Sequence, residues 1–273
     1  MCRIRPGEPD DAGALAAFLR QEVPPEVVSM TVVGCPGFEI HVRQTLCAAA
    51  RGSRSTFWVA EHGGTVAGVA ELRWMAGALF LNHLFVTPSH QGQGLGSRLL
   101  WYSINGLVDW SRAGSMQLAL DVLEQNRRAR RWYQQLGLTQ AHSRRWLLRK
   151  RPLDDRPGGR RWSVDGWAQA EVMQQALGFS EFHLHSSTGT YRVGRLGDHL
   201  YRTRDARLME DPIALGALAE LDAERDLLCI ANEDGLTDQR AQGQTVARSL
   251  RLAAPVGVVL QRLARRLRWP AAA

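Results

Sequence analysis

The chain has 273 residues, 45% of them hydrophobic, and a formal net charge of +7. This length suffices for one large hydrophobic core or two modest ones. No apolar run approaches the roughly 18 residues of a membrane span, and the first ten residues lack the apolar core of a signal peptide. We therefore expect a cytoplasmic protein without a membrane span.

The first part of the chain alternates strand and helix patterns. A strand over residues 3–5 precedes a helix that Asp10 or Asp11 can cap. Pro24 and Pro25 break the chain before a second helix over residues 38–50. Three strands follow, at residues 57–61, 65–74 and 79–86, and the first two are joined by a turn at residues 62–64.

A glycine-rich segment follows the third of these strands. Gly92, Gly94 and Gly96 precede an amphipathic helix with apolar residues at core spacing. Glycine lets another group approach the backbone closely, and the first turn of a helix offers unpaired N–H groups and the positive end of the dipole. Together they form a socket for phosphate oxygens. No lysine follows Gly96, as a P-loop needs, and Ser97 stands where a dinucleotide fingerprint needs its third glycine.

The pattern that fits is Gln-x-x-Gly-x-Gly, at Gln91, Gly94 and Gly96, preceded by Val-x-Pro and followed by Leu-Leu. It resembles the pyrophosphate-binding motif of the GNAT superfamily of acyl-CoA N-acyltransferases. An ordinary glycine-rich turn between a strand and a helix is the alternative interpretation.

A second segment resembles the same family. Residues 118–126 predict a strand, and residues 127–136 predict a short helix that ends at Gly137. The spacing of Asn126, Ala129, Tyr133, Gly137 and Leu138 is similar to that of the family's second cofactor motif. A strand over residues 138–150 completes this part.

The resemblance covers residues 1 to about 150. It implies an α+β fold for residues 1–151, with a mixed, largely antiparallel sheet flanked by helices, and acetyl-CoA as the acyl donor. Asn126 would contact the pantetheine arm, and Tyr133 would protonate the departing thiolate. A backbone amide near Phe85 or Val86, at a widening between two strands, would bind the acyl or pantetheine carbonyl oxygen. The implied donor-binding residues are Leu84, Phe85, Val86, Gln91, Gly92, Gln93, Gly94, Leu95, Gly96, Ser97 and Asn126.

The general base is less evident. Relatives often place Glu or His on the strand before the glycine loop, on the face of Val86. Alternation places His83 on the opposite face unless a bulge shifts the register, and Glu71 on the neighbouring strand is the other ionisable candidate. A water relay, or an amine of depressed pKa, would need no side-chain base.

Residues 152–161 predict a linker, and residues 162–273 predict a smaller C-terminal α/β region. Its expected elements are helices at 164–177 and 212–221, a hairpin of 182–185 with 190–193, a strand at 226–231 and a terminal helix at 256–269 docked with its arginines in solvent. The region has no second Gln-x-x-Gly-x-Gly. A degenerate repeat, a lid and a dimerisation element all remain open for it, as does a homodimer.

Cysteine and histidine spacing indicates no metal. Cys2, Cys35, Cys47 and Cys229 form no Cys-x-x-Cys pair and have no histidine at ligand spacing beside them, so we expect reduced thiols. His183 and His185 share a strand face but have no evident third ligand, so we place them on the surface.

The distribution of charge along the chain indicates which kinds of partner it could bind. Residues 127–161 hold 12 basic residues against Asp154 and Asp155, a local charge of +10. Such a block can steer coenzyme A or an RNA backbone, although a solvated face explains most of it. We expect an N-acetyltransferase that acts on a small-molecule, peptide or protein amine or, less favoured, an aminoacyl-tRNA. The alternative is a non-catalytic acyl-CoA sensor or scaffold.

Overall fold

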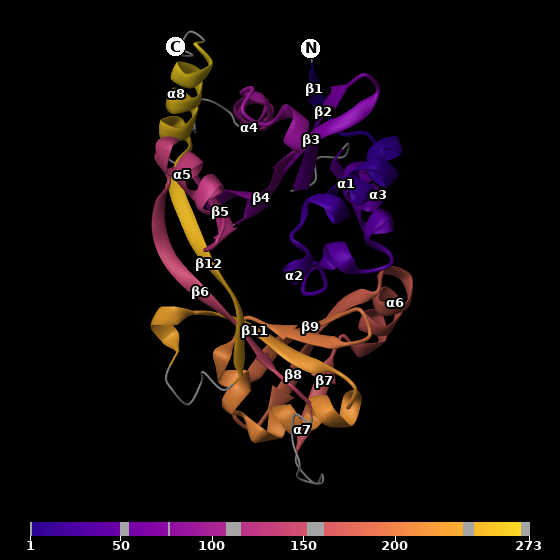
Figure 1. The fold of residues 1–273 in the computed structure, drawn as a ribbon. Helices are drawn as coiled ribbons and strands as arrows, with labels where there is room; N and C mark the ends of the chain where they lie inside the picture. Colours follow the sequence, from indigo (N-terminus) through magenta and orange to yellow (C-terminus); the bar gives the residue numbers. More distant parts are fainter. Residues whose placement is uncertain are drawn as a thin grey trace. The chain divides into compact units, whose positions relative to one another are not determined.

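A computed structural model of the chain describes residues 2–49, 55–75, 77–107, 116–151, 161–236 and 243–268. The chain divides into two compact units (Figure 1). The first comprises residues 1–22, 39–141 and 250–273, and the second comprises residues 23–38 and 142–249. Among the helices in the described ranges, none is long and apolar enough to cross a membrane.

The first unit contains the elements that the family resemblance implied. Its strands are β1 (Arg3–Pro6), β2 (Ser55–His62), β3 (Thr65–Met75), β4 (Ala78–Val86) and β5 (Gln117–Leu123). Its helices are α1 (Ala12–Glu22), α3 (Phe38–Ala49), α4 (Leu95–Asn105), α5 (Arg127–Gln135) and α8 (Val256–Leu267). Two further strands, β6 (Thr139–Arg149) and β12 (Gln244–Pro255), each have residues in both units.

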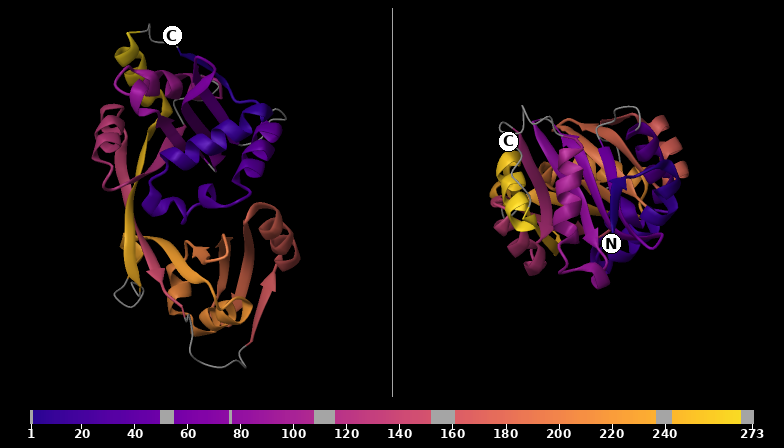
Figure 2. Two further views of the ribbon diagram at one scale, coloured as in Figure 1. Left: turned by 45° about the vertical axis from the view of Figure 1, so that its right-hand side comes forward. Right: turned by 90° about the horizontal axis from the view of Figure 1, so that it is seen from above.

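Strands β1 to β4 pair antiparallel in chain order, and β4 pairs parallel with β5. The end of β12 lies beside β5 and leads directly into α8. Apolar residues of β3, β4, β5, α4, β12 and α8 form one buried cluster. Figure 2 shows α8, in yellow, beside the sheet of this unit. Residues 250–263 therefore contribute to the core of the N-terminal unit.

The second unit has its own core and sheet. Its helices are α2 (Pro25–Val28), α6 (Trp167–Leu177) and α7 (Pro212–Leu221), and its strands are β7 (Trp162–Asp165), β8 (Phe179–Ser186), β9 (Thr190–Leu196), β10 (Leu200–Thr203) and β11 (Asp226–Asn232). Strands β7 to β10 pair antiparallel in chain order. Strand β10 pairs parallel with β11, which pairs antiparallel with β6.

The two units share an order of elements. In the first unit, four antiparallel strands lead through α4 to a parallel strand, β5. In the second unit, four antiparallel strands lead through α7 to a parallel strand, β11. The first and second strands are separated by helices in both units: α1 to α3 between β1 and β2, and α6 between β7 and β8.

The structure corrects several expectations for the C-terminal half. The helix predicted at 164–177 begins only at Trp167, because residues 162–165 pair with β8 as strand β7. Strands β10 and β12 were not predicted, since β10 is only four residues long and β12 carries polar residues at its start. The compact units also differ from the predicted division at residues 151–162. Of the predicted linker, residues 152–160 lie outside the described residues.

Candidate active site

The glycine segment forms an exposed loop between β4 and α4. Gly92 and Gly94 have φ angles of 79° and 77°, a region that strains residues with a Cβ. Gly94 is the N-cap of α4 and supplies no side-chain cap. A Cβ added at either position would meet no atom within 4 Å. The first turn of α4 therefore presents uncapped N–H groups to open space, as an anion site requires.

Ser97, in the first turn of α4, adds a second polar group at this place. Its side chain is 2% exposed, and its Oγ atom is buried without a hydrogen-bond partner in the described structure. A buried hydroxyl without a partner costs free energy, so a ligand oxygen at this position would satisfy it.

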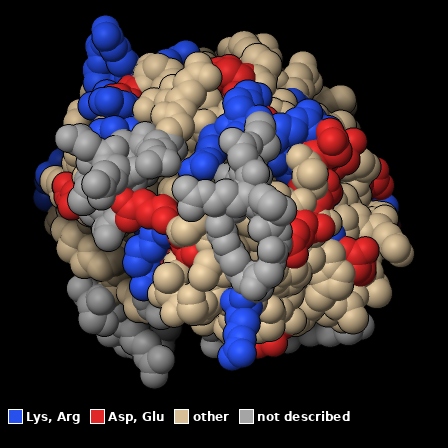
Figure 3. Space-filling model, turned by 90° about the horizontal axis from the view of Figure 1, so that it is seen from below, with Lys and Arg blue, Asp and Glu red and all other residues tan. Residues whose placement is uncertain are grey.

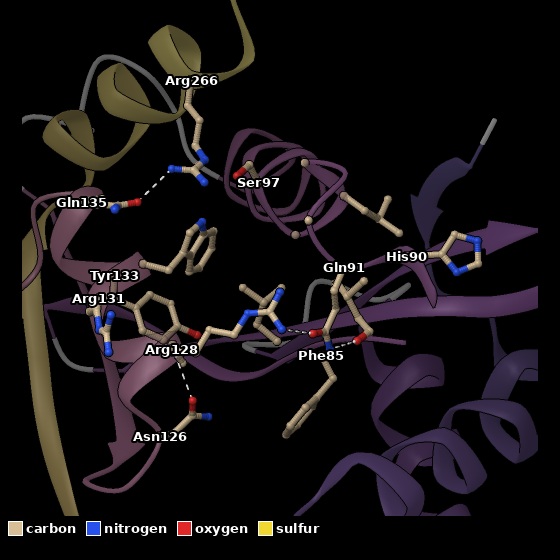
Figure 4. A pocket seen from close by; sticks show the side chains of 18 of the residues that line it. Phe85, His90, Gln91, Ser97, Asn126, Arg128, Arg131, Tyr133, Gln135 and Arg266 are labelled. Atoms are coloured by element: carbon tan, nitrogen blue, oxygen red, sulfur yellow. Dashed lines mark hydrogen bonds between the residues drawn. The ribbon is translucent and has the colours of Figure 1, made fainter. Parts of the chain in front are cut away.

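The loop borders a cavity of about 720 Å³ within the first unit (Figure 4). The cavity brings together β4, the glycine loop, α4, α5 and one residue of α8. Of the predicted donor-binding residues, all except Gln93 line it, and so does Tyr133. The lining residues are Glu22, Leu84, Phe85, Val86, His90, Gln91, Gly92, Gly94, Leu95, Gly96, Ser97, Asn126, Arg127, Arg128, Ala129, Arg131, Trp132, Tyr133, Gln135 and Arg266.

The two glutamines of the loop are held by the protein itself. Gln91 donates from Nε2 to the Val86 carbonyl oxygen at 2.8 Å and accepts from Arg128 Nη1 at 2.6 Å (Figure 4). Gln93 donates to the Ser89 carbonyl oxygen at 2.9 Å. Gln91 therefore ties the glycine loop to the end of β4 and to α5, which fixes one side of the cavity relative to the other.

Strands β4 and β5 separate at the cavity. Their parallel pairing runs from Ala78 to Leu81 on β4, and it is not continued over residues 82–86, which remain paired with β3. Leu84, Phe85 and Val86 line the cavity. This is the widening that the family resemblance implied. It exposes backbone groups of β4 that can bind a carbonyl oxygen.

Tyr133 and Asn126 enter the cavity from α5 (Figure 4). Tyr133 is 8% exposed, and burial raises the pKa of its hydroxyl above the ordinary value of 10.0. That hydroxyl has no hydrogen-bond partner among the described residues, so it is free to contact a ligand. Asn126 is the N-cap of α5, and its Oδ1 accepts from the Ala129 amide at 3.0 Å. Its amide group remains able to donate.

Arginines supply the charge of the cavity. Arg127, Arg128 and Arg131 come from α5, and Arg266 comes from α8. Arg266 donates from Nη1 to Gln135 Oε1 at 3.0 Å (Figure 4). The sequence placed the α5 arginines in a basic block but did not identify any of them as a residue of the cavity. Arg266 was expected in solvent, because no local pattern reveals that α8 docks beside α5.

The two candidate bases lie together but do not line this cavity. The nearest approach of His83 Nε2 to Glu71 Oε2 is 3.5 Å. Glu71 is 1% exposed and accepts hydrogen bonds from Arg73 at 2.5 Å, Asn82 at 2.8 Å and Ser55 at 3.1 Å. Burial alone would raise the pKa of Glu71, but the charges of Arg73 and His83 and the hydrogen bonds from Arg73 and Asn82 lower it overall. Burial lowers the pKa of His83 against the opposing attraction of Glu71.

A bulge does shift the register of β4, but before His83. Glu71 pairs with His83, whereas Leu72 pairs with Leu81, so Asn82 is the extra residue. From His83 to Val86 the alternation is regular. Val86 packs against Leu95 and Leu99 of α4, and His83, three residues earlier, points to the other face.

Helix α7 of the second unit corresponds to α4 but begins differently. Strand β10 leads to α7 without a glycine loop, and Asp211 caps α7 by accepting from the amides of Ile213 and Ala214 at 2.9 and 3.0 Å. The carboxylate thus occupies the first N–H groups of α7, whereas the corresponding N–H groups of α4 are left open. The second unit has the same order of elements but a closed anion socket.

The basic block is largely neutralised where β6 passes through the second unit. Arg145 pairs with Glu233, Lys150 with Asp226 and Arg151 with Glu224. Basic and acidic side chains are also interspersed on the face shown in Figure 3. These pairs reduce the positive charge available to a polyanion.

The fold and the cavity define an α+β domain with an open anion socket at the first turn of α4. Residues 28–138 match the model of the acetyltransferase (GNAT) family, so this part of the chain is similar to that family. The family match supports an enzyme of N-acetyltransferase type that takes an acyl group from an acyl-CoA.

Solved structures extend the likeness to nearly the whole chain. A tandem GNAT protein from the clavulanic acid biosynthesis pathway, solved without acetyl-CoA, has a TM-score of 0.65 at 15% identity, covering 94% of this chain and 99% of its own. A GCN5-related N-acetyltransferase from Sphaerobacter thermophilus has a TM-score of 0.58 at 14% identity, covering 93% and 96%. At these identities the likeness concerns the fold. A search of curated proteins found no significant match.

Proposed function

We propose that the protein transfers an acetyl group from acetyl-CoA to a primary amine by direct attack, with Tyr133 as general acid. The observation that carries this proposal is the convergence, in one cavity, of the uncapped first turn of α4 and the unpartnered hydroxyl of Tyr133. The first suits a pyrophosphate, and the second suits a leaving thiolate.

Different residues of the cavity would serve the separate steps of the reaction. The α4 N-terminus and the cavity arginines hold the phosphates, so that reaction becomes effectively intramolecular once the amine docks. The amine nitrogen then bonds to the thioester carbon, and the charge that develops on the carbonyl oxygen is stabilised by backbone N–H groups on the unpaired edge of β4. The C–S bond breaks, and the thiolate takes a proton from Tyr133.

The reaction also requires a group that accepts the proton of the amine. The attacking nitrogen loses one proton and the thiolate gains one, so the proton leaving the amine can restore Tyr133. Burial keeps Tyr133 protonated at neutral pH, because it raises the hydroxyl pKa. His83 and Glu71 stay candidates for accepting the amine proton. Since neither lines the cavity, they would act through water.

The donor site belongs to the first unit alone. In the second unit the Asp211 carboxylate caps α7, so we propose that residues 162–273 include a degenerate copy of the fold that binds no phosphate. The amine acceptor is a small molecule or a peptide or protein amine. Aminoacyl-tRNA is less favoured, because acidic partners neutralise Arg145, Lys150 and Arg151 of the basic block.

The test is a screen of acetyl-CoA against small amines, peptides and aminoacyl-tRNA, following CoA release and the acetylated product by mass. We expect release of CoA that depends on the amine. If acetyl-CoA binds but no amine in the panel is acetylated, the sensor alternative is favoured. Activity on tRNA that falls steeply with added salt would favour the RNA acceptor.

A further inference from the structure

Three potential metal ligands, distant in sequence, meet beside the glycine loop. Cys2 immediately precedes β1, His62 ends β2, and His90 ends the short helical turn that precedes Gln91. One ligand atom from each lies within 4.8 Å of the other two. All belong to the first unit. No spacing in the sequence indicates this cluster, because a sheet register and a loop create it.

The sheet register explains the first pair. Arg3 pairs with Glu61 in the antiparallel ladder of β1 and β2, which places Cys2 opposite His62. The Cys2 Sγ atom lies 3.9 Å from His62 Nδ1. The His62 and His90 rings are 5.0 Å apart between centroids.

His90 is oriented for such a role. Its Nδ1 lies 2.9 Å from Thr87 Oγ1 and 3.0 Å from Ser89 Oγ. Hydrogen bonds to one ring nitrogen fix the orientation of a metal-binding histidine and leave the other nitrogen for the metal. The loop therefore presents His90 with a supporting partner already in place.

We propose that Cys2, His62 and His90 form a binding site for a zinc-class transition-metal ion, with water in the fourth position. One thiolate and two imidazoles are ligands that such ions prefer. Zinc bond lengths and tetrahedral angles place sulfur and nitrogen ligand atoms about 3.6 Å apart and two nitrogens about 3.4 Å apart. The cluster needs only small side-chain rotations to reach this geometry.

Binding converts the Cys2 thiol into a metal thiolate and releases its proton to solvent. The ion would then link β1 and β2 to the loop that carries Gln91 and the glycines. The metal site stands on its own ligand geometry and does not require the proposed acyl transfer.

The test measures binding of Zn²⁺ and Co²⁺ to the untagged, reduced full-length protein. We expect one Zn²⁺ per chain, a higher melting temperature with zinc, and a Co²⁺ spectrum with a thiolate charge-transfer band. Cys2→Ser should abolish that band, and His62→Ala should weaken binding by more than about 100-fold, beyond the roughly 10- to 100-fold losses typical of outer-shell changes. The matched controls are Cys47→Ser and His183→Ala, which change an exposed cysteine and an exposed histidine elsewhere.

Two further measurements test the proposed metal site. Cys2 is partly exposed and His62 is exposed, so without metal the variants should melt at the temperature of the metal-free wild type, which separates lost ligation from lost folding. Stoichiometric zinc binding that survives both substitutions would overturn the proposal, as would a wild-type protein that binds no zinc at micromolar concentration.

Discussion

Replacing Gly94 by alanine separates the ligand role of the glycine loop from its backbone role. Gly94 caps α4 with φ of 77°, and an added Cβ meets nothing within 4 Å. The folded protein therefore loses only the free energy of a left-handed residue, about 1–2 kcal/mol. Each kcal/mol corresponds to roughly 2–4 °C in melting temperature for a chain of this size.

The same methyl group stands where a phosphate would approach the N–H groups of α4. Loss of one hydrogen bond to a charged group costs about 1.5–3 kcal/mol, which corresponds to a roughly 10- to 100-fold weaker affinity. We expect isothermal titration with acetyl-CoA to show this loss for Gly94→Ala.

Gly166 provides the matched control. It is the N-cap of α6 with φ of 78°, and an added Cβ there also meets nothing within 4 Å. Gly166→Ala should cost similar stability and leave acetyl-CoA affinity unchanged. Equal affinities for the two variants would refute the assignment of the glycine loop as the phosphate site.

Three further results are expected. Arg266→Ala should weaken CoA binding several-fold and reduce its salt dependence, as titrations at two salt concentrations would show, whereas the exposed Arg265→Ala should not. Titration of the wild type should give one acetyl-CoA per chain, and two sites would contradict the closure of α7 by Asp211. Because burial lowers the folded-state pKa of His83, the unfolded chain binds this proton first as pH falls below about 6.5. Denaturation should therefore show stability decreasing from pH 7 to 5, with a shallower slope for His83→Gln, and an unchanged slope would contradict this.

The elements around the candidate donor site were predictable because their sequence pattern is local. The strand, glycine loop and helix from residue 79 to 105 form a continuous pattern, and the helix that carries Tyr133 begins and ends at recognisable residues, Asn126 and Gly137. The structure confirms these elements and brings them into one cavity. The face of His83 followed equally from alternation, because the bulge at Asn82 precedes it.

Long-range features were not predictable in this way. Residues 250–273 join the first unit because β12 lies beside β5 and α8 packs on α4, which placed Arg266 at the cavity. Segment 23–38 belongs to the second unit, where the Gly37 amide donates to the Leu177 carbonyl oxygen. A periodic pattern of hydrophobic residues indicates that one face of a helix or strand is buried, but it does not identify the element that covers that face.

We propose that this cavity performs acyl transfer with Tyr133 as the acid. This proposal is tested most directly by comparing the wild type with Tyr133→Phe in CoA release from acetyl-CoA, using an amine that the wild type acetylates. The hydroxyl has no partner in the described structure, so its removal should leave folding and acetyl-CoA affinity nearly unchanged. We predict that kcat falls about 10²- to 10⁴-fold. An unchanged kcat would contradict the account.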